Sequence, residues 1–266
     1  MRKSLAELAI LPFDVRYALS HGGSEFGCHE IVQLARPEFY GLAPYLAIKA
    51  LDGEPNSQRE LIDRLVQHFS RGNGYESLES VVMQHLNGSG IKVRAGKVAQ
   101  INRIGPALVE EKFREFAEEA YKNGSTPVLL SYAALIGLRS FVEKYLSNNP
   151  KNTSNYKGGF FVIIPKFLGR EFVGYTIRRN QEGIRVEHLS DLRDLTLCDV
   201  TLIDDTINSG STIRNVLDFW RNHDVFPRTV TIRYIDIVSI NNFLKNLSYY
   251  VTNKMVKLPK ELENNA

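Results

Sequence analysis

The chain has 266 residues, of which 43% are hydrophobic and 24% are charged. This composition supports a large buried core and excludes a disordered or fibrous protein. No stretch reaches the roughly 18 consecutive apolar residues of a membrane span, and the first residues lack the features of a secretion signal. We therefore expect a cytoplasmic protein of one or two domains, with no membrane partner.

The formal net charge of +3 is unevenly distributed. Residues 1–125 carry a net charge of −1 and residues 126–266 carry +4. The basic excess in the C-terminal half suits a ligand with several phosphates, and the N-terminal half lacks the general basic character of a nucleic-acid-binding domain. Cys28 and Cys198 cannot build a disulfide framework and are interpreted as structural. Cys28 and His29 have no second pair at zinc-site spacing, so we expect no zinc site there.

The first half of the chain has mainly helical patterns. Residues 57–69 have a cap-like start followed by an apolar helical face, and a second short helix is expected over 75–86. Residues 91–104 alternate apolar and polar side chains, as a hairpin does. Two helices followed by a hairpin is the order of a winged helix. A small helical subdomain that covers an active site is the preferred interpretation, because the local charge is mixed.

The pattern changes after an amphipathic helix expected over 108–121, which Asn123 and Gly124 end. Helical spacing follows over 135–146 and 212–220. Apolar strands are expected at 127–132, 160–164, 172–177, 200–203 and 229–237. Continuously apolar strands that alternate with helices indicate a parallel sheet buried on both faces. We therefore predict a mostly helical N-terminal region over 1–124 and an α/β domain over 125–266.

One segment combines an apolar strand, two acids and a turn rich in hydroxyl groups, and it leads into a helix. It runs from Val200 to Thr212. The strand delivers the turn to the carboxyl edge of the sheet, where open α/β folds bind their ligands. Backbone N–H groups and hydroxyls at a helix N-terminus suit a phosphate, and Gly210 allows a close backbone approach. Asp204 and Asp205 can accept from ribose hydroxyls, directly or through a divalent cation.

This segment resembles the phosphoribosyl-diphosphate (PRPP) signature of type I phosphoribosyltransferases, with Ser209 where Thr is more usual. The resemblance covers about half the chain and implies the parallel-sheet α/β core of that family, with Mg²⁺ as cofactor and a homodimer as a common assembly. It implies a catalytic and metal-holding role for Asp204 and Asp205, the metal being held through ribose or water. It implies PRPP binding by Thr206, Ile207, Asn208, Ser209, Gly210, Ser211 and Thr212.

Two further loops follow from the resemblance. The family's pyrophosphate loop falls at Tyr132, Ala133 and Ala134, where glycines and a basic residue are more usual and no cation occurs before Arg139. The second strand of the domain ends before Lys166, near the place where orotate-type enzymes carry an Arg-Lys pair. Lys166 and Arg170, on a loop that could cover the ligand, are the candidate phosphate contacts, against the alternative that they are ordinary surface charges.

The residue before Ser209 bears on the substrate. Enzymes for 6-oxopurines usually have an acid there, whereas Asn208 is not a base at neutral pH. A hypoxanthine or guanine enzyme is therefore disfavoured. Phe219 and Trp220 are expected in the core. Core packing is also preferred for Tyr249 and Tyr250, with stacking on a base as the alternative.

Two functions fit the intact ligand loop better than a third possibility, an accessory fold that has lost both enzymatic and regulatory activity. The preferred one is an enzyme that transfers phosphoribosyl from PRPP to a nitrogen nucleophile, with a nucleobase other than a 6-oxopurine as the expected acceptor. The alternative is a PRPP-sensing transcriptional regulator, similar to purine-operon repressors, in which a winged helix binds DNA. The cations of the expected hairpin favour the regulator, and the net charge of the N-terminal half does not.

Overall fold

The computed structural model describes residues 25–26, 55–74, 81, 85, 93–94, 106–130, 138–143, 159–165, 172–180, 183–188 and 192–263. The helix expected over 75–86 and the hairpin expected over 91–104 lie almost wholly outside these residues. Of the first 100 residues, two short described strands, β1 (Glu25–Phe26) and β2 (Val93–Arg94), pair antiparallel with each other. No helix in the described ranges combines the length and the apolar character that crossing a membrane requires.

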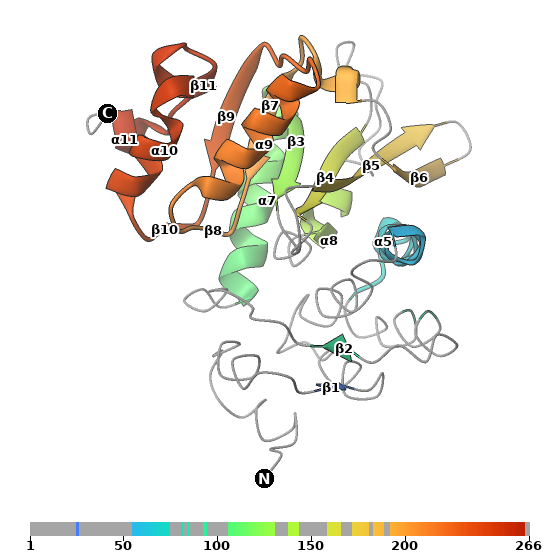
Figure 1. The fold of residues 1–266 in the computed structure, drawn as a ribbon. Helices are drawn as coiled ribbons and strands as arrows, with labels where there is room; N and C mark the ends of the chain where they lie inside the picture. Colours follow the sequence, from blue (N-terminus) through green and yellow to red (C-terminus); the bar gives the residue numbers. More distant parts are fainter. Residues whose placement is uncertain are drawn as a thin grey trace.

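A seven-stranded sheet forms the centre of the C-terminal half (Figure 1). Its order is β11 (Val256–Lys257), β9 (Thr229–Arg233), β7 (Asp199–Ile203), β3 (Thr126–Leu130), β4 (Gly159–Pro165), β5 (Phe172–Asn180) and β6 (Gly183–His188). The first five strands are parallel, which confirms the predicted parallel α/β core. The expectation that β5 continues the parallel sheet is wrong, because β4, β5 and β6 form an antiparallel meander.

Strand β7 lies inside the sheet, with β3 on one side and β9 on the other. Val200 and Leu202 are fully buried in the main core cluster. The β-branched and aliphatic residues of β7 suit a strand with neighbours on both edges. The predicted strand at 200–203 is therefore confirmed.

Helices cover both faces of the sheet (Figure 1). They are α7 (Pro106–Lys122), the short α8 (Leu138–Phe141), α9 (Ser211–Asn222), α10 (Ile240–Thr252) and α11 (Lys260–Glu263). Helix α9 buries Ile213, Val216, Leu217 and Trp220, which share one helical face at the spacing expected for an amphipathic helix. These side chains and Phe243 of α10 pack on the apolar face of β7 and β9. The helices predicted over 108–121 and 212–220 are confirmed.

The strand predicted over 229–237 is divided in two. Strand β9 ends at Arg233, and β10 (Asp236–Ile237) continues after Tyr234 and Ile235. Strand β7 is interrupted in the same way by Asp204 and Asp205 before β8 (Thr206–Ile207), which pairs parallel with β10. The carbonyl of Asp205 accepts from the N–H groups of Ile235 (3.1 Å) and Asp236 (3.2 Å), so the two interruptions are joined. Both strands therefore leave the sheet together at its carboxyl edge.

Helix α5 (Pro55–Ser70) confirms the helix expected over 57–69 and lies along the free edge of β6. The carboxylate of Asp63 accepts from the N–H of Val186 at 3.2 Å, and the side-chain amide of Gln67 donates to the carbonyl of Ile184. Gln58 of the same helix accepts from the buried Tyr175 hydroxyl of β5 at 2.9 Å. Side chains of α5 thus bond to backbone groups that a further strand would otherwise pair. The domain boundary at 124/125 remains a prediction.

Candidate functional site

The two predicted acids lie between β7 and β8, in the interior of the protein. Asp204 is 7% exposed and Asp205 is 5% exposed. The N–H of Asp204 donates to the carbonyl of Arg233 at 3.1 Å, which continues the β7–β9 ladder by one residue. The N–H of Asp205 donates to Oδ1 of Asp204 at 3.0 Å. The backbone therefore fixes both carboxyl groups at the carboxyl edge of the sheet.

Burial raises the pKa of both acids. It raises the pKa of Asp204 well above its usual range, and the negative charge of Asp205 raises that pKa further. Burial also raises the pKa of Asp205, against the lowering effect of a hydrogen bond with the Asp204 side chain. Neither carboxyl belongs to an ion pair within the described ranges. A cation placed beside the pair would favour the ionised form that burial disfavours.

The predicted loop turns sharply at Gly210 and then begins α9. Gly210 has φ 74° and ψ 6°, a left-handed conformation that favours glycine. Its carbonyl accepts the first helical hydrogen bond, from the N–H of Arg214 at 2.9 Å. The N–H groups of Ser211, Thr212 and Ile213 precede that bond at the start of the helix. The helix predicted over 212–220 thus begins one residue earlier, at Ser211.

The start of α9 has no side-chain cap. Residue 210 is its N-cap residue and, as a glycine, offers no side-chain acceptor for the first turn. Helix α10, by contrast, begins with Ser239, whose hydroxyl accepts from the N–H of Asn242 at 3.4 Å. An uncapped helix N-terminus presents N–H groups and a positive dipole end to an anion. The N-terminus of α9 therefore has donors that could bind a phosphate or a carboxylate.

Helix α10 holds this loop from the opposite side. The side-chain amide of Asn246 donates to the carbonyl of Ser209 at 2.7 Å, and its oxygen accepts from Arg214 at 3.0 Å. Phe243, which is fully buried, lies against Gly210. Neither contact of α10 could be predicted from the sequence, because each joins residues more than 30 positions apart and leaves no local pattern. The loop is thus supported by a helix that follows it in the chain.

The remaining loop residues differ in what their side chains do. Ile207 is 2% exposed and packs in the core, while its carbonyl accepts from the N–H of Val238 at 2.8 Å. The hydroxyl of Thr206 is buried and has no hydrogen-bond partner within the described part of the chain. Asn208 is exposed, and the Ser209 hydroxyl lies 3.3 Å from that of Ser211. The exposed side chains of the loop are therefore those of Asn208 and Ser211, and Ser209 and Thr212 are half-buried.

Several predicted site residues lie outside the described part of the chain. Tyr132, Ala133 and Ala134 of the expected pyrophosphate loop lie outside the described residues, as do Lys166 and Arg170. Arg139, the first cation after that loop, forms an ion pair with Glu143 at 2.6 Å within α8 and the turn after it. Cys28 and the cations Lys92, Lys97 and Arg103 of the expected hairpin also lie outside these ranges. Their functions stay predictions.

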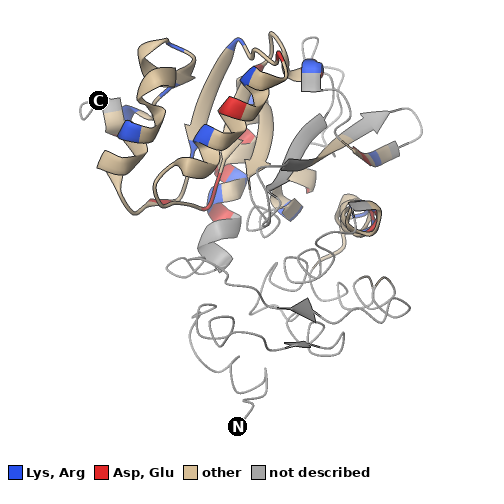
Figure 2. Cartoon of the chain, viewed as in Figure 1, with Lys and Arg blue, Asp and Glu red and all other residues tan. Residues whose placement is uncertain are grey.

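The core positions predicted for aromatic residues are confirmed in part. Trp220 is 1% exposed, and Tyr250 is 2% exposed and donates to the Asp218 carboxylate, so core packing is confirmed for both. Core packing is wrong for Tyr249, which is 52% exposed with the Arg221 guanidinium 5.4 Å from its ring centroid. Both tyrosines belong to α10, a helix that the sequence patterns did not indicate. Acidic and basic side chains alternate along α9, as Figure 2 shows.

No protein-family model and no curated protein matches the chain. Among solved structures, the chain is similar to a hypoxanthine-guanine phosphoribosyltransferase from Bacillus anthracis, with 17% identity over 50% of this chain and 68% of that one and a TM-score of 0.26. It is also similar to the hypoxanthine phosphoribosyltransferase from Trypanosoma cruzi in complex with IMP, with 12% identity over 50% and 74% of the two chains and a TM-score of 0.25.

Proposed function

We propose that the chain binds PRPP at Asp204 to Thr212 and transfers its phosphoribosyl group to a nitrogen nucleophile. The observation that carries the proposal is the arrangement of two buried acids and an uncapped helix N-terminus at the carboxyl edge of one interior strand. An anion at the start of α9 and a hydroxylated ring beside the acids match the two ends of a ribose 5-phosphate. One ligand would therefore use both parts of the site.

The 5′-phosphate is assigned to the loop. The N–H groups of Ser211 and Thr212 and the hydroxyls of Ser209, Ser211 and Thr212 provide several donors within one turn. Gly210 keeps the backbone free of a side chain at the turn itself. The bond from Asn246 to the Ser209 carbonyl at 2.7 Å holds the loop in this form before a ligand arrives. A preformed loop lowers the entropy cost of binding.

Asp204 and Asp205 are assigned to the ribose hydroxyls and to Mg²⁺. Their adjacent carboxyls fit this ion, which is commonly held by one or two carboxylates together with waters and substrate phosphates. In the described part of the chain, no group of three or more His, Cys, Asp or Glu residues forms a complete metal site, so substrate oxygens would complete the coordination. When bound, Mg²⁺ would neutralise charge on the pyrophosphate oxygens.

The reaction breaks the bond between C1 of the ribose and the pyrophosphate oxygen, and the nucleophile nitrogen forms the new bond to C1. The electron pair of the broken bond leaves with pyrophosphate, and the nitrogen loses its proton to solvent. Positive charge develops on the ribose ring as pyrophosphate departs, so ionised carboxylates beside the ring stabilise the transition state. The loop contributes by holding the ribose in one orientation.

The proposed acceptor is a nucleobase other than a 6-oxopurine. The support is Asn208, the exposed residue that precedes Ser209. Its amide accepts and donates hydrogen bonds but does not take up a proton at neutral pH. An acceptor that needs a protein base at this position would therefore react poorly.

The test is incubation of the protein with PRPP, Mg²⁺ and a panel of nucleobases, followed by measurement of released pyrophosphate. We expect release with at least one base, and loss of release in the variant Asp204→Asn/Asp205→Asn. Asp224→Asn, at an exposed carboxyl beyond α9, is the matched control and should keep full activity. The absence of a calorimetric signal with millimolar PRPP and Mg²⁺ in a folded sample would contradict the proposal.

A regulator would give a different set of results. It would bind PRPP and release no pyrophosphate with any base, and PRPP would change its affinity for an operator DNA with a steep salt dependence. The cations that favour this alternative lie outside the described residues, apart from Arg94 of β2. The same protein sample serves both measurements.

A further inference from the structure

The sheet has one face on which the strands near its β11 edge are polar. In β9, Val230 and Ile232 are buried toward α9 and α10, whereas Thr229, Thr231 and Arg233 point the other way and are more exposed. Strands of parallel sheets are usually apolar on both faces, because helices cover both. The sequence of β9 shows this alternation, because its polar residues alternate with Val230 and Ile232. The second face of these strands is therefore suited to polar contacts rather than to a packed helix.

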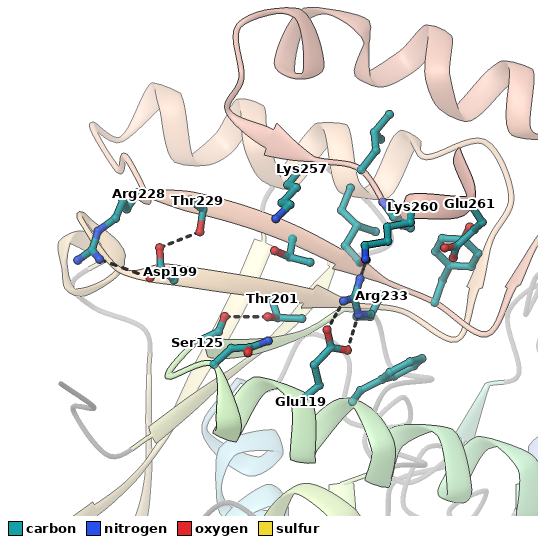
Figure 3. A pocket seen from close by; sticks show the side chains of 17 residues that line it. Glu119, Ser125, Asp199, Thr201, Arg228, Thr229, Arg233, Lys257, Lys260 and Glu261 are labelled. Carbon is teal, nitrogen blue, oxygen red and sulfur yellow. Dashed lines mark hydrogen bonds and ion pairs between the residues drawn. The ribbon is translucent and has the colours of Figure 1, made fainter. Parts of the chain in front are cut away.

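A groove of about 950 Å³ runs along this face (Figure 3). Its floor is formed by β7 and β9, with hydroxyls at Thr201, Thr229 and Thr231. Helix α7 forms one wall and residues 257–261 form the other. The volume lies in the range of small-molecule sites, and the hydroxyl floor is richer in polar groups than most of them.

Ion pairs occupy the two ends of the groove. At one end the Arg233 guanidinium binds the carboxylate of Glu119, which fixes α7 to β9. At the other end Arg228 lies 3.5 Å from Asp199, which also accepts from the Thr229 hydroxyl at 2.7 Å. Figure 3 shows these pairs with the strand floor between them. The acids at both ends are thus already engaged by cations of the protein.

Two lysines of the wall have no partner among the described residues. Lys257 and Lys260 are exposed and point into the groove, and neither has a hydrogen bond or ion pair with any described residue. The third charged residue of that wall, Glu261, lies close to Arg233 and Tyr234 and contributes to raising the pKa of both. The positive charge available to a ligand therefore comes from two lysines above a floor of threonine hydroxyls.

We propose that this groove binds a small hydroxylated organic anion, in the chemical class of a sugar phosphate. Lys257 and Lys260 would hold the phosphate as two mobile point charges, and the hydroxyls of Thr229 and Thr231 would exchange hydrogen bonds with those of the sugar. The groove lies on the face of β7 and β9 opposite to α9. It is a second site, and it does not depend on the function proposed for the α9 loop.

The experiment maps lysine reactivity. The full-length protein is acetylated briefly with an amine-specific ester, with and without ribose 5-phosphate, and each lysine is quantified by mass spectrometry. Labelling of Lys257 and Lys260 should fall about threefold when roughly two thirds of the protein molecules have ligand in the groove. Lys245, exposed on α10 and outside the groove, is the internal control and should not change. The same protection should occur in Asp204→Asn/Asp205→Asn, which would show that it does not require the acids assigned to the ribose in the proposed PRPP site.

A second variant tests the floor. Thr231→Val keeps the shape of the side chain and removes its hydroxyl, so the concentration of ribose 5-phosphate needed for protection should rise several-fold, while that of inorganic phosphate should not. Thr252→Val, at the exposed end of α10, should leave both unchanged.

Three results would overturn the proposal. The first is that millimolar ligand does not protect Lys257 and Lys260 from labelling. The second is that Lys245 is protected to the same extent. The third is that Lys257 and Lys260 of the ligand-free protein become reactive only when the protein is diluted. The last result would mean that a second copy of the chain covers the groove.

Discussion

Phe243 lies so close to Gly210 that a Cβ atom added at residue 210 would be 2.7 Å from its Cδ2 atom. Real Cβ atoms do not approach a carbon this closely, so either the ring or the loop would have to move. The left-handed φ of 74° adds a second requirement for glycine at the same residue. The start of α9 is therefore fixed by one contact and one backbone angle together.

We predict that Gly210→Ala lowers the free energy of unfolding by about 2 to 4 kcal/mol, through backbone strain and overpacking. Gly124→Ala is the matched control, since Gly124 has φ 61° and nothing within 4 Å of an added Cβ. It should cost only the strain, about 1 kcal/mol. Urea unfolding measures both values. Equal losses in the two variants would mean that Phe243 does not restrict residue 210.

Asn246 should set the affinity of the loop. Asn246→Ala removes the donor to the Ser209 carbonyl, and we expect the Kd for PRPP to rise about five- to tenfold, as the loss of roughly 1 kcal/mol requires. Asn242→Ala, one turn earlier on α10 and exposed, is the control and should leave the Kd unchanged. Calorimetry provides the measurement. A Kd that is the same in both variants would contradict the supporting role of Asn246.

The buried acids should make stability depend on pH. The folded protein raises the pKa of Asp204, so its carboxyl contributes full stability below the unfolded pKa and loses it as pH rises through the folded pKa. Asp204→Asn has no such loss. At neutral pH we expect this variant to be more stable than the wild type, with the difference vanishing at a pH below the ordinary pKa of an aspartate. Urea unfolding across this pH range, with Asp224→Asn as control, tests the sign.

The same shift should link ligand binding to proton release. Mg²⁺ and PRPP need ionised carboxylates, whereas burial favours protonated ones, so binding should release protons while either acid is protonated. Affinity should therefore rise with pH up to the pKa of the pair and then level. Calorimetry in two buffers of different ionisation enthalpy counts the protons. Affinity that falls as pH rises over this range would show that the acids bind in their protonated form.

The centre of the fold was predictable because its signals are local. Strand β7 and helix α9 follow directly from an apolar run and from apolar spacing along one helical face. Strand direction is not local, since the apolar pattern of β5 is the same whether it pairs parallel or antiparallel with β4. Strand β6 was missed because its sequence, from Gly183 to His188, alternates charged residues with only two aliphatic ones.

The residues of the candidate site likewise differ in whether the sequence could identify them. Asp204, Asp205 and Gly210 could be identified from the sequence, because a motif fixes their spacing. The contacts of α10 could not, because that helix begins with two asparagines among its first three residues and gives a weak helical signal. Its position is set by burial of Phe243, Leu247 and Tyr250 against the core. Tertiary packing, rather than propensity, places the residues that support the loop.

The contact between α5 and β6 also determines how the protein can be shortened. A fragment that begins at residue 125 would lack Asp63 and Gln67, which bond to Val186 and Ile184 on the outer edge of β6. That edge would then be open to strands of other molecules, which is a common route to aggregation. The opposite edge of the sheet is only two residues long and carries Lys257, so it offers a poor template. A soluble fragment should therefore retain α5.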